Sequence, residues 1–378
     1  MRIGLGVSVL ARGRAGEGIA GIGSYTWHLG NELVRRGLAE VRPVSFRWPV
    51  ETGLVGEVPG IQVPSRYHGG ALRSALLPVR TPGARAIERR VDLFHAPDHM
   101  VPRLRRVPVV ATVHDAILLA HPEWYDPRFR RLRRWLWRQT TRWADRIVTV
   151  SEYARAQIAY HFDVAPACIT VVPNGVDDRF FARFSAESRE AIRAEHGLPP
   201  HFFLTVGTLQ PRKNMERVLA AHARLPRSLR TDCPLVVVGR QGWQCGRLVE
   251  RLQAAEERGE AYWLPGLPDR ELRALMQAAE ALVFPSLAEG FGLPVLEAFA
   301  SGLPVITSST TALPEVAGDA ALLVDPHCHE AIAGAMTQVL ESPELQGQLR
   351  ARGRERARRF SWARCAEETL AVYTELVG

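Results

Sequence analysis

Short apolar runs alternate with longer amphipathic segments along the whole chain. The runs lie at residues 2–7, 41–46, 92–95, 108–113, 145–150 and 169–172, and again at 201–207, 235–239, 262–266, 281–284 and 303–307. Strands that are buried on both faces of a parallel sheet read as continuous apolar runs. The alternation of strand and helix patterns therefore predicts α/β structure, with parallel sheets covered by helices on both faces.

Two segments interrupt this pattern. Residues 48–90 are rich in proline and glycine, and the sequence predicts no regular element there. The stretch Pro173-Asn174-Gly175 follows the last apolar run of the first half, and Asn-Gly after a proline favours a turn. With 378 residues, the chain is long enough for two domains of ordinary size.

The richest segment chemically is EGFGLPVLE, residues 289–297, which follows the apolar run 281–284. Pro294 suits the first position of a helix, and Gly290 and Gly292 allow a ligand to approach the backbone closely. A helix start of this kind suits a phosphate. Glu289 and Glu297 frame it, and carboxylates there would accept hydrogen bonds from hydroxyls. The segment therefore indicates a site for a nucleotide sugar. A strand–turn–helix unit with two solvated glutamates and no ligand would have the same sequence pattern.

A second candidate site contains the only lysine of the chain. The net charge is +8 with a pI near 9.7, and nearly all of the positive charge is arginine. This charge favours an anionic partner such as a nucleic acid, an anionic lipid or a phosphorylated substrate. Arg212 and Lys213 come directly after the run 201–207 and before a helix that we expect Asn214 to cap. Two cations before a helix start suit a diphosphate, although the single lysine could also have survived by chance.

In the first half, two features could contact a ligand. Residues 13–23 form a glycine-rich loop that ends with Gly21 and Gly23 before a helix, and such a loop is either a phosphate or sugar contact or a plain connector. His114 and Asp115 end the apolar run 108–113, at the edge where open α/β sheets bind ligands. The pair could orient an imidazole against a sugar hydroxyl, but a purely structural histidine explains the dipeptide as well.

The segment Arg128–Arg138 is a strongly basic helix. The helical period puts Phe129, Leu132, Leu136 and Trp143 on one face, joined by Trp135, and leaves the arginines and Trp137 for the other faces. Such a helix suits an anionic membrane surface, or it packs by its apolar side and is otherwise solvated. No nucleic-acid-reading module accompanies the charge, so nucleic-acid binding is not expected.

Cysteines and hydropathy favour a cytoplasmic protein. The five cysteines (Cys168, Cys233, Cys245, Cys328 and Cys365) are scattered, which predicts reduced, buried thiols and neither a metal site nor disulfides. No apolar run is long enough to span a bilayer, and the N-terminus has no signal-peptide pattern.

The spacing E-x7-E with Gly-Phe-Gly-Leu inside it resembles the signature of the retaining GT-B glycosyltransferases of family 4, and the surrounding segments match in order. The resemblance implies two Rossmann-like domains facing a central cleft, with a C-terminal helix crossing back to the first domain. It places the passage between domains at the PNGVD turn. The expected domains are residues 1–176, which bind the acceptor, residues 177–358, which bind the nucleotide sugar, and the helix 359–378.

The resemblance also assigns roles to the candidate residues. Arg212 and Lys213 would hold the diphosphate, Glu289 would accept hydrogen bonds from the transferred sugar, and Glu297 would accept them from the ribose. The backbone of Gly290, Phe291, Gly292 and Leu293 would lie against the donor. His114 would contact the donor sugar, and the loop with Gly21 and Gly23 would close over donor and acceptor.

The function implied is a retaining transfer of a hexose, with the leaving phosphate helping to deprotonate the acceptor. The second half looks like bacterial mannosyltransferases of cell-surface polysaccharide synthesis. GDP-mannose is therefore the preferred donor, with UDP-glucose or a dTDP-deoxysugar as alternatives and a saccharide or lipid-linked acceptor. We expect no metal or other cofactor, and a cytoplasmic protein that is peripheral on the inner membrane face. Three further classes remain open: a nucleotide-sugar epimerase, a phosphorylase with Lys213 as its only candidate Schiff-base lysine, and a non-catalytic scaffold.

Overall fold

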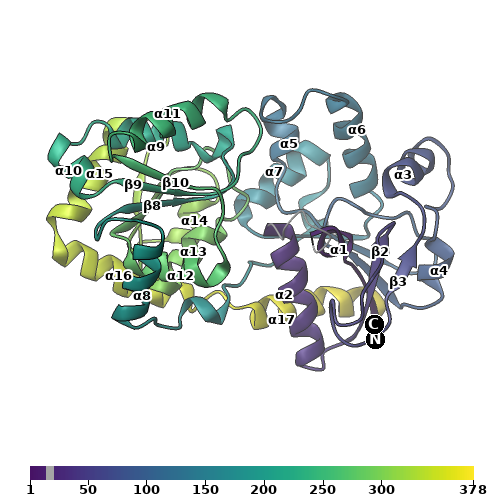
Figure 1. Cartoon of the computed structure of the whole chain (residues 1–378). Helices are drawn as coiled ribbons and strands as arrows, with labels where there is room; N and C mark the ends of the chain where they lie inside the picture. Colours follow the sequence, from purple (N-terminus) through teal and green to yellow (C-terminus); the bar gives the residue numbers. More distant parts are fainter. Residues whose placement is uncertain (14–20) are drawn as a thin grey trace. The chain divides into compact units, whose positions relative to one another are not determined.

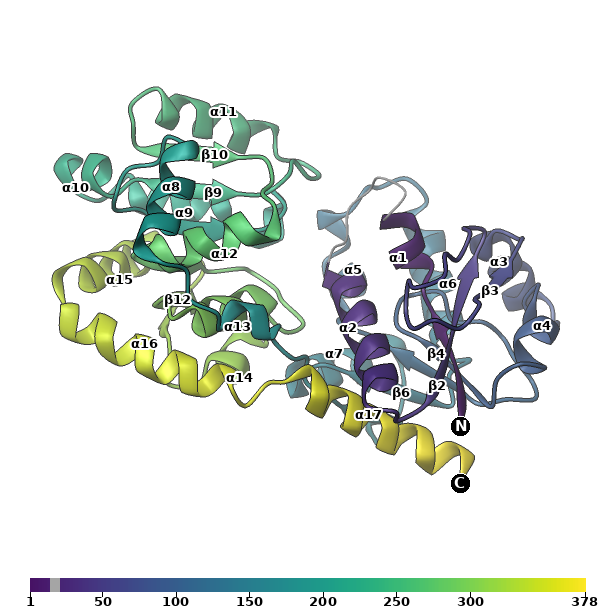
Figure 2. The same cartoon turned by 60° about the horizontal axis from the view of Figure 1, so that its bottom comes forward.

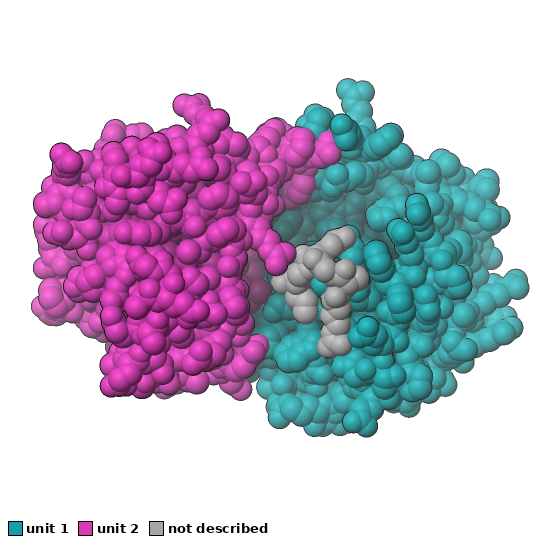
Figure 3. All heavy atoms as spheres, viewed as in Figure 1, with its two compact units in different colours: residues 1–122, 127–175, 361–378 teal, residues 123–126, 176–360 magenta. Residues whose placement is uncertain are grey.

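The computed structural model describes residues 1–13 and 21–378. They form two compact units, which Figure 3 shows in different colours. Unit 1 contains residues 1–122, 127–175 and 361–378, and unit 2 contains residues 123–126 and 176–360. The last segment of the chain thus belongs to the unit that the first half forms.

Unit 1 is built on a seven-stranded parallel sheet with the order β3-β2-β1-β4-β5-β6-β7. Figure 1 labels β2 and β3, which pair at one edge of this sheet. Its strands are β1 (Arg2–Gly6), β2 (Glu40–Phe46), β3 (Ile61–Val63), β4 (Leu93–Ala96), β5 (Val109–Thr112), β6 (Arg146–Thr149) and β7 (Ile169–Val171). Every residue of β4 and β5 is buried, which explains why the central strands have no polar alternation.

Helices cover this sheet and include the last helix of the chain. They are α1 (Ser8–Arg12), α2 (Gly21–Arg35), α3 (Tyr67–Leu76), α4 (Ala84–Glu88), α5 (Ile117–Ala120), α6 (Arg130–Thr141), α7 (Glu152–Phe162) and α17 (Trp362–Val377). Helix α17 packs beside α2 (Figure 2). Ser151 caps the start of α7, because its hydroxyl accepts a hydrogen bond from the Ala154 N–H at 3.0 Å.

Unit 2 repeats the plan with a six-stranded parallel sheet in the order β10-β9-β8-β11-β12-β13. Its strands are β8 (Phe203–Val206), β9 (Leu235–Val238), β10 (Ala261–Leu264), β11 (Ala281–Phe284), β12 (Val305–Ser308) and β13 (Leu322–Val324). Its helices are α8 (Ala186–Glu195), α9 (Met215–His222), α10 (Arg227–Asp232), α11 (Gly246–Glu256), α12 (Asp269–Ala278), α13 (Leu293–Ser301), α14 (Leu313–Ala317), α15 (His329–Glu341) and α16 (Pro343–Ala357). The prediction of two parallel α/β sheets is confirmed.

Two segments differ from the sequence prediction. Residues 48–90 contain regular structure after all, because β3 adds to the edge of the sheet and α3 and α4 follow it. The sequence shows no apolar run for β3, because this strand has only three residues and the alternating burial of an edge strand. The C-terminal helix expected at residues 359–378 begins later, as α17 at Trp362, after a break from α16 at residues 358–361. The Ser361 hydroxyl caps α17 by accepting a hydrogen bond from the Arg364 N–H.

The faces of α6 also differ from the prediction. Trp137, expected outside, is the buried tryptophan and is only 6% exposed, whereas Phe129, Leu132 and Trp135, expected on the packing face, are exposed. Trp137 packs edge-on against the Phe162 ring at a centroid distance of 4.9 Å, so a tertiary contact, and not the apolar stripe, decides the orientation of the helix.

The thiols are partly as predicted. The five cysteines are free, and Cys233, Cys245 and Cys365 are buried. Cys168 is exposed and Cys328 half-buried, so the prediction that all five are buried is wrong for these two, which lie in a turn after α7 and at the N-cap of α15. Within residues 1–13 and 21–378, no helix is long and apolar enough to cross a membrane.

Candidate functional site

The loop after β8 brings the only lysine into a buried position. Pro211–Lys213 form one turn of 3-10 helix, and the Arg212 carbonyl accepts a hydrogen bond from the Leu287 N–H at 2.8 Å, which ties this loop to the one after β11. The Lys213 side chain is 10% exposed and its ammonium lies 4.6 Å from the centre of the Phe284 ring. Gly207 has φ 137°, and a Cβ there would come within 3.3 Å of Lys213 Cε. The loop therefore fits closely around the aliphatic part of this lysine.

Glu289 joins the two predicted motifs. Its Oε2 accepts a hydrogen bond from Arg212 Nη1 at 2.8 Å, and its Oε1 accepts one from Lys213 Nζ at 2.6 Å. The same Arg212 nitrogen donates to the Ala288 carbonyl at 3.2 Å. The sequence analysis predicted that these two cations and this carboxylate bind the same ligand. In the structure, Glu289 is in direct contact with both cations.

The charges of this cluster are set by burial and pairing together. Burial alone would raise the pKa of Glu289, but the positive charges of Arg212 and Lys213 outweigh it and lower this pKa to about 2. Burial lowers the pKa of Lys213, and Glu289 opposes that shift. Glu289 is therefore an anion at any physiological pH, with two cations held on it.

Helix α13 begins directly after the glycine-rich turn. Gly292 is its N-cap with φ 119°, and a Cβ there would lie 2.7 Å from Leu313 Cδ2, so only glycine fits. Leu293 is the first helical residue and Pro294 the second, one position later than predicted. Phe291 is buried and packs edge-on against Phe360 at a centroid distance of 5.9 Å. This contact anchors the turn beside the N-terminus of the helix.

Glu297 lies in the second turn of α13 and is half-buried. Its pKa is raised to about 7, mainly by burial and also by the carboxylates of Asp269 and Asp177, against the lowering effect of Lys213. Among the residues that the structure describes, no side chain or backbone group hydrogen-bonds to the Glu297 carboxylate. The carboxylate therefore retains its capacity to accept hydrogen bonds from a ligand.

His114 of unit 1 follows β5, as predicted. Its Nε2 lies 3.1 Å from the Pro97 carbonyl oxygen. A carbonyl can only accept, so Nε2 carries the proton. Burial lowers the pKa of His114 to about 4, which makes the imidazole neutral at pH 7 and leaves Nδ1 as an acceptor. The Asp115 carboxylate accepts from the Ile117 N–H at 2.9 Å and so shapes the start of α5.

The other candidates of the first half are only partly described. Gly21 and Gly23 are the first and third residues of α2, so they belong to a helix and not to the predicted loop. Residues 14–20 of that loop lie outside the described residues.

Asn214 of unit 2 also differs from its prediction. Its side chain makes no capping hydrogen bond and instead donates to the carbonyls of Pro285 at 2.8 Å and Pro326 at 2.7 Å.

Comparisons with known proteins identify the family. Residues 19–180 match the family model described as Glycosyltransferase Family 4, and residues 188–356 match the one described as Glycosyl transferases group 1. The chain is 33% identical to the O-antigen chain mannosyltransferase B of Escherichia coli over 283 residues, which are 74% of each chain. It belongs to the family 4 glycosyltransferases. The predicted family is thereby confirmed, and the protein is a glycosyltransferase enzyme.

Two further similarities agree with this assignment. The glycosyltransferase is 31% identical to the serotype-specific mannosyltransferase WbdA of E. coli over 275 residues, which are 71% of this chain and 33% of that longer protein. A crystal structure of WaaG, described as a glycosyltransferase involved in lipopolysaccharide biosynthesis, matches with a TM-score of 0.73 at 20% identity, over 99% of this chain and 100% of that one. The structural match shows that the fold is GT-B.

Sequence reasoning missed a buried polar network in unit 1 of the glycosyltransferase. His95 Nδ1 lies 2.6 Å from the Tyr373 hydroxyl, His95 Nε2 lies 2.7 Å from Thr112 Oγ1, and Thr112 Oγ1 lies 2.9 Å from the Tyr25 hydroxyl. The Tyr25 ring packs edge-on against His114 at 4.7 Å. The four hydrogen-bonded residues come from β4, β5, α2 and α17, and no local pattern could connect positions so far apart in sequence.

Proposed function

We propose that this glycosyltransferase transfers mannose from GDP-mannose to a saccharide or lipid-linked acceptor, with retention of the anomeric configuration, in the synthesis of a cell-surface polysaccharide. The mannosyltransferase names of the two E. coli relatives support the choice of sugar and pathway. UDP-glucose and dTDP-deoxysugars are the alternative donors.

One observation carries the proposal: two cations held on a single buried carboxylate beside the N-terminus of α13. The negative charge of a diphosphate is attracted to Arg212 and Lys213, and the start of a helix adds a positive dipole end. The cations then stabilise the charge that grows on the leaving nucleotide diphosphate as the sugar–oxygen bond breaks. Because Arg212 and Lys213 provide this charge, we propose that no metal ion and no other cofactor is needed.

The two glutamates take different parts in this proposal. Glu297 has an open carboxylate, and it accepts hydrogen bonds from the ribose. Glu289 accepts from hydroxyls of the transferred sugar while it keeps Arg212 and Lys213 in place. His114 has Nδ1 as an acceptor and contacts the same sugar. The acceptor hydroxyl attacks from the face that the phosphate leaves, and a phosphate oxygen takes its proton.

We further propose that α6 binds the anionic inner face of the cytoplasmic membrane. Its arginines divide into two groups. Arg130, Arg134 and Arg138 donate to the carbonyls of Pro122, Leu119 and His161 and so hold the helix to unit 1. The guanidinium groups of the exposed Arg131 and Arg133 make no hydrogen bond or ion pair with the described residues. The exposed Phe129, Leu132 and Trp135 lie among them. Exposed arginines interleaved with aromatic and aliphatic side chains are typical of interfacial helices.

Calorimetric titration with GDP, UDP and dTDP, without metal, tests the donor site. We expect GDP to bind most tightly and Glu297→Ala to abolish most of the affinity. Tightest binding of UDP or dTDP would replace GDP-mannose with the corresponding alternative. Analysis of the sugar nucleotide after incubation without acceptor separates the transferase from an epimerase, which would return an isomerised donor.

A further inference from the structure

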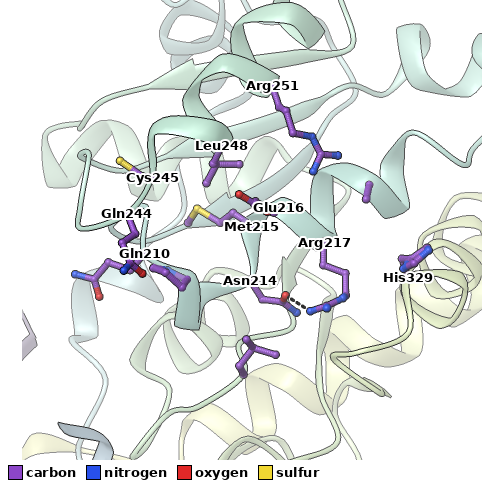
Figure 4. A pocket seen from close by; sticks show the side chains of 13 residues that line it. Gln210, Asn214, Met215, Glu216, Arg217, Gln244, Cys245, Leu248, Arg251 and His329 are labelled. Carbon is purple, nitrogen blue, oxygen red and sulfur yellow. Dashed lines mark hydrogen bonds between the residues drawn. The ribbon is translucent and has the colours of Figure 1, made fainter. Parts of the chain in front are cut away.

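Unit 2 contains a pocket that none of the roles above uses. It has a volume of about 400 Å³ and lies between α9, the start of α11 and the start of α15 (Figure 4). Its apolar lining includes Met215, Leu248 and Leu287, and its polar lining includes Arg217, Arg251 and His329. The volume falls in the range of small-molecule sites.

This pocket is separate from the candidate donor site but shares a wall with it. Gln210, Pro211 and Asn214 line it, whereas Arg212 and Lys213, between them in sequence, do not and instead contact Glu289. The loop 210–214 therefore has one side at the donor site and the other at the pocket.

The lining has two arginines, Arg217 and Arg251, and one carboxylate, the exposed Glu216, so its charge is unbalanced toward the positive. The Arg217 guanidinium donates to Asn214 Oδ1 at 2.6 Å, and within residues 1–13 and 21–378 neither Arg217 nor Arg251 pairs with a carboxylate. Both are half-buried, and Figure 4 shows them on the same side of the pocket as His329. A half-buried guanidinium without an acid is costly unless a ligand supplies the negative charge, and the guanidinium fork fits phosphate oxygens.

The rest of the lining indicates more than a bare anion. The apolar side chains can pack on the face of a sugar ring, and the Gln210 and Gln244 amides can donate to or accept from its hydroxyls. Gln244 has φ 57°, an uncommon backbone conformation for glutamine. An organic phosphate with a polar ring satisfies both parts of this lining.

We propose that this pocket binds a phosphorylated saccharide, with its phosphate between Arg217 and Arg251, at a site distinct from that of the nucleotide sugar. The same chemistry is offered by a free sugar phosphate and by the phosphate at the head of a lipid-linked saccharide. A ligand in this pocket contacts the loop that carries Arg212 and Lys213, so its binding can shift these two side chains and thereby alter the donor site.

Calorimetric titration of the full chain with mannose 6-phosphate tests the proposal without reference to activity. We expect binding that weakens at least about tenfold in both Arg217→Gln and Arg251→Gln, since each removes a charge-assisted contact. Arg227→Gln removes an exposed arginine of α10 outside the pocket and is expected to bind as the wild type does. Lys213→Gln, which alters the diphosphate cluster, is also expected to retain binding of the probe.

Three results would overturn the proposal. They are no binding of mannose 6-phosphate, inorganic phosphate binding as tightly as the sugar phosphate, and loss of binding in Lys213→Gln with retention in Arg251→Gln. Circular dichroism of each variant verifies its fold. A second titration with a dodecyl phosphodiester of mannose distinguishes the sources: tighter binding of the monoester identifies a free sugar phosphate, and tighter binding of the diester identifies the head of a lipid-linked acceptor.

Discussion

If Glu297 accepts hydrogen bonds from the ribose, as we propose, its raised pKa should make donor binding depend on pH. The carboxyl has a pKa of about 7 in the protein, and only its ionised form can accept with both oxygens, one for each hydroxyl of a ribose. A ligand that binds the ionised form must first remove the proton at lower pH. Affinity for the donor should therefore rise as the pH rises through 7 and become constant above it.

The size of the effect follows from the fraction ionised. With this pKa, about one tenth of the carboxyl groups are ionised at pH 6 and about nine tenths at pH 8, so the affinity should rise roughly tenfold between them. GDP-mannose is the suitable probe, because its diphosphate is esterified at both ends. Unlike GDP, it therefore has no phosphate group that titrates near neutrality. The proposal of a ribose contact would also require about half a proton to be released per donor bound at pH 7.

Calorimetry at pH 6, 7 and 8, in buffers of different ionisation enthalpy, measures both the affinity and the proton release. Glu297→Gln is the matched control, because it keeps the shape and one acceptor oxygen but cannot titrate. Its affinity should be weaker and independent of pH. If the wild type binds equally well at pH 6 and 8, or if the variant keeps the same tenfold change, Glu297 is not the ribose acceptor.

Four further predictions follow from the same geometry. Lys213→Arg should lower kcat/KM about 100-fold, because the guanidinium does not fit between Phe284 and Gly207, and near-normal turnover would refute this reasoning. Glu289→Gln should destabilise the protein by about 3 kcal/mol in chemical denaturation, since two cations lose their carboxylate; saturating GDP should restore part of the loss, and an unchanged midpoint would contradict the pairing. Glu297→Gln should stabilise unit 2 by about 2 kcal/mol at pH 8 and not at pH 4. The pKa of Glu297 is higher in the folded protein than its unfolded value of 4.5, so the folded protein with Glu297 loses stability as the pH rises from 4.5 to 7. Equal stabilisation at both pH values would argue against the raised pKa. Reversing the charge of the exposed Arg131 and Arg133 should weaken binding to anionic vesicles at least about tenfold in a sedimentation assay, with the same reversal at Arg227 and Arg247 of unit 2 as control; unchanged binding would assign α6 a structural role only.

The sequence was informative where chemistry and backbone requirements occur within a few residues. The buried strands read as apolar runs, and the short spacing in residues 289–297 specified a glycine-rich turn before a helix, which the structure contains. The sequence was uninformative where contacts between distant segments determine a strand or the orientation of a helix. The three-residue strand β3 is defined only by its pairing with β2, and the buried face of α6 only by the contact between Trp137 and Phe162.

The same limit applies to the charges of the site. Glu289 and Glu297 are identical residues in one motif, yet their pKa values are driven in opposite directions, to about 2 and about 7. The first lies against Arg212 and Lys213, which come from a loop more than 70 residues away, and the second lies near the carboxylates of Asp269 and Asp177. A pair of acids whose surroundings separate their pKa values is suited to two different tasks. In this enzyme one glutamate stays charged and holds the cations that we propose bind the diphosphate. The other, as the proposed ribose acceptor, would lose its proton when the nucleotide binds and regain it when the nucleotide leaves.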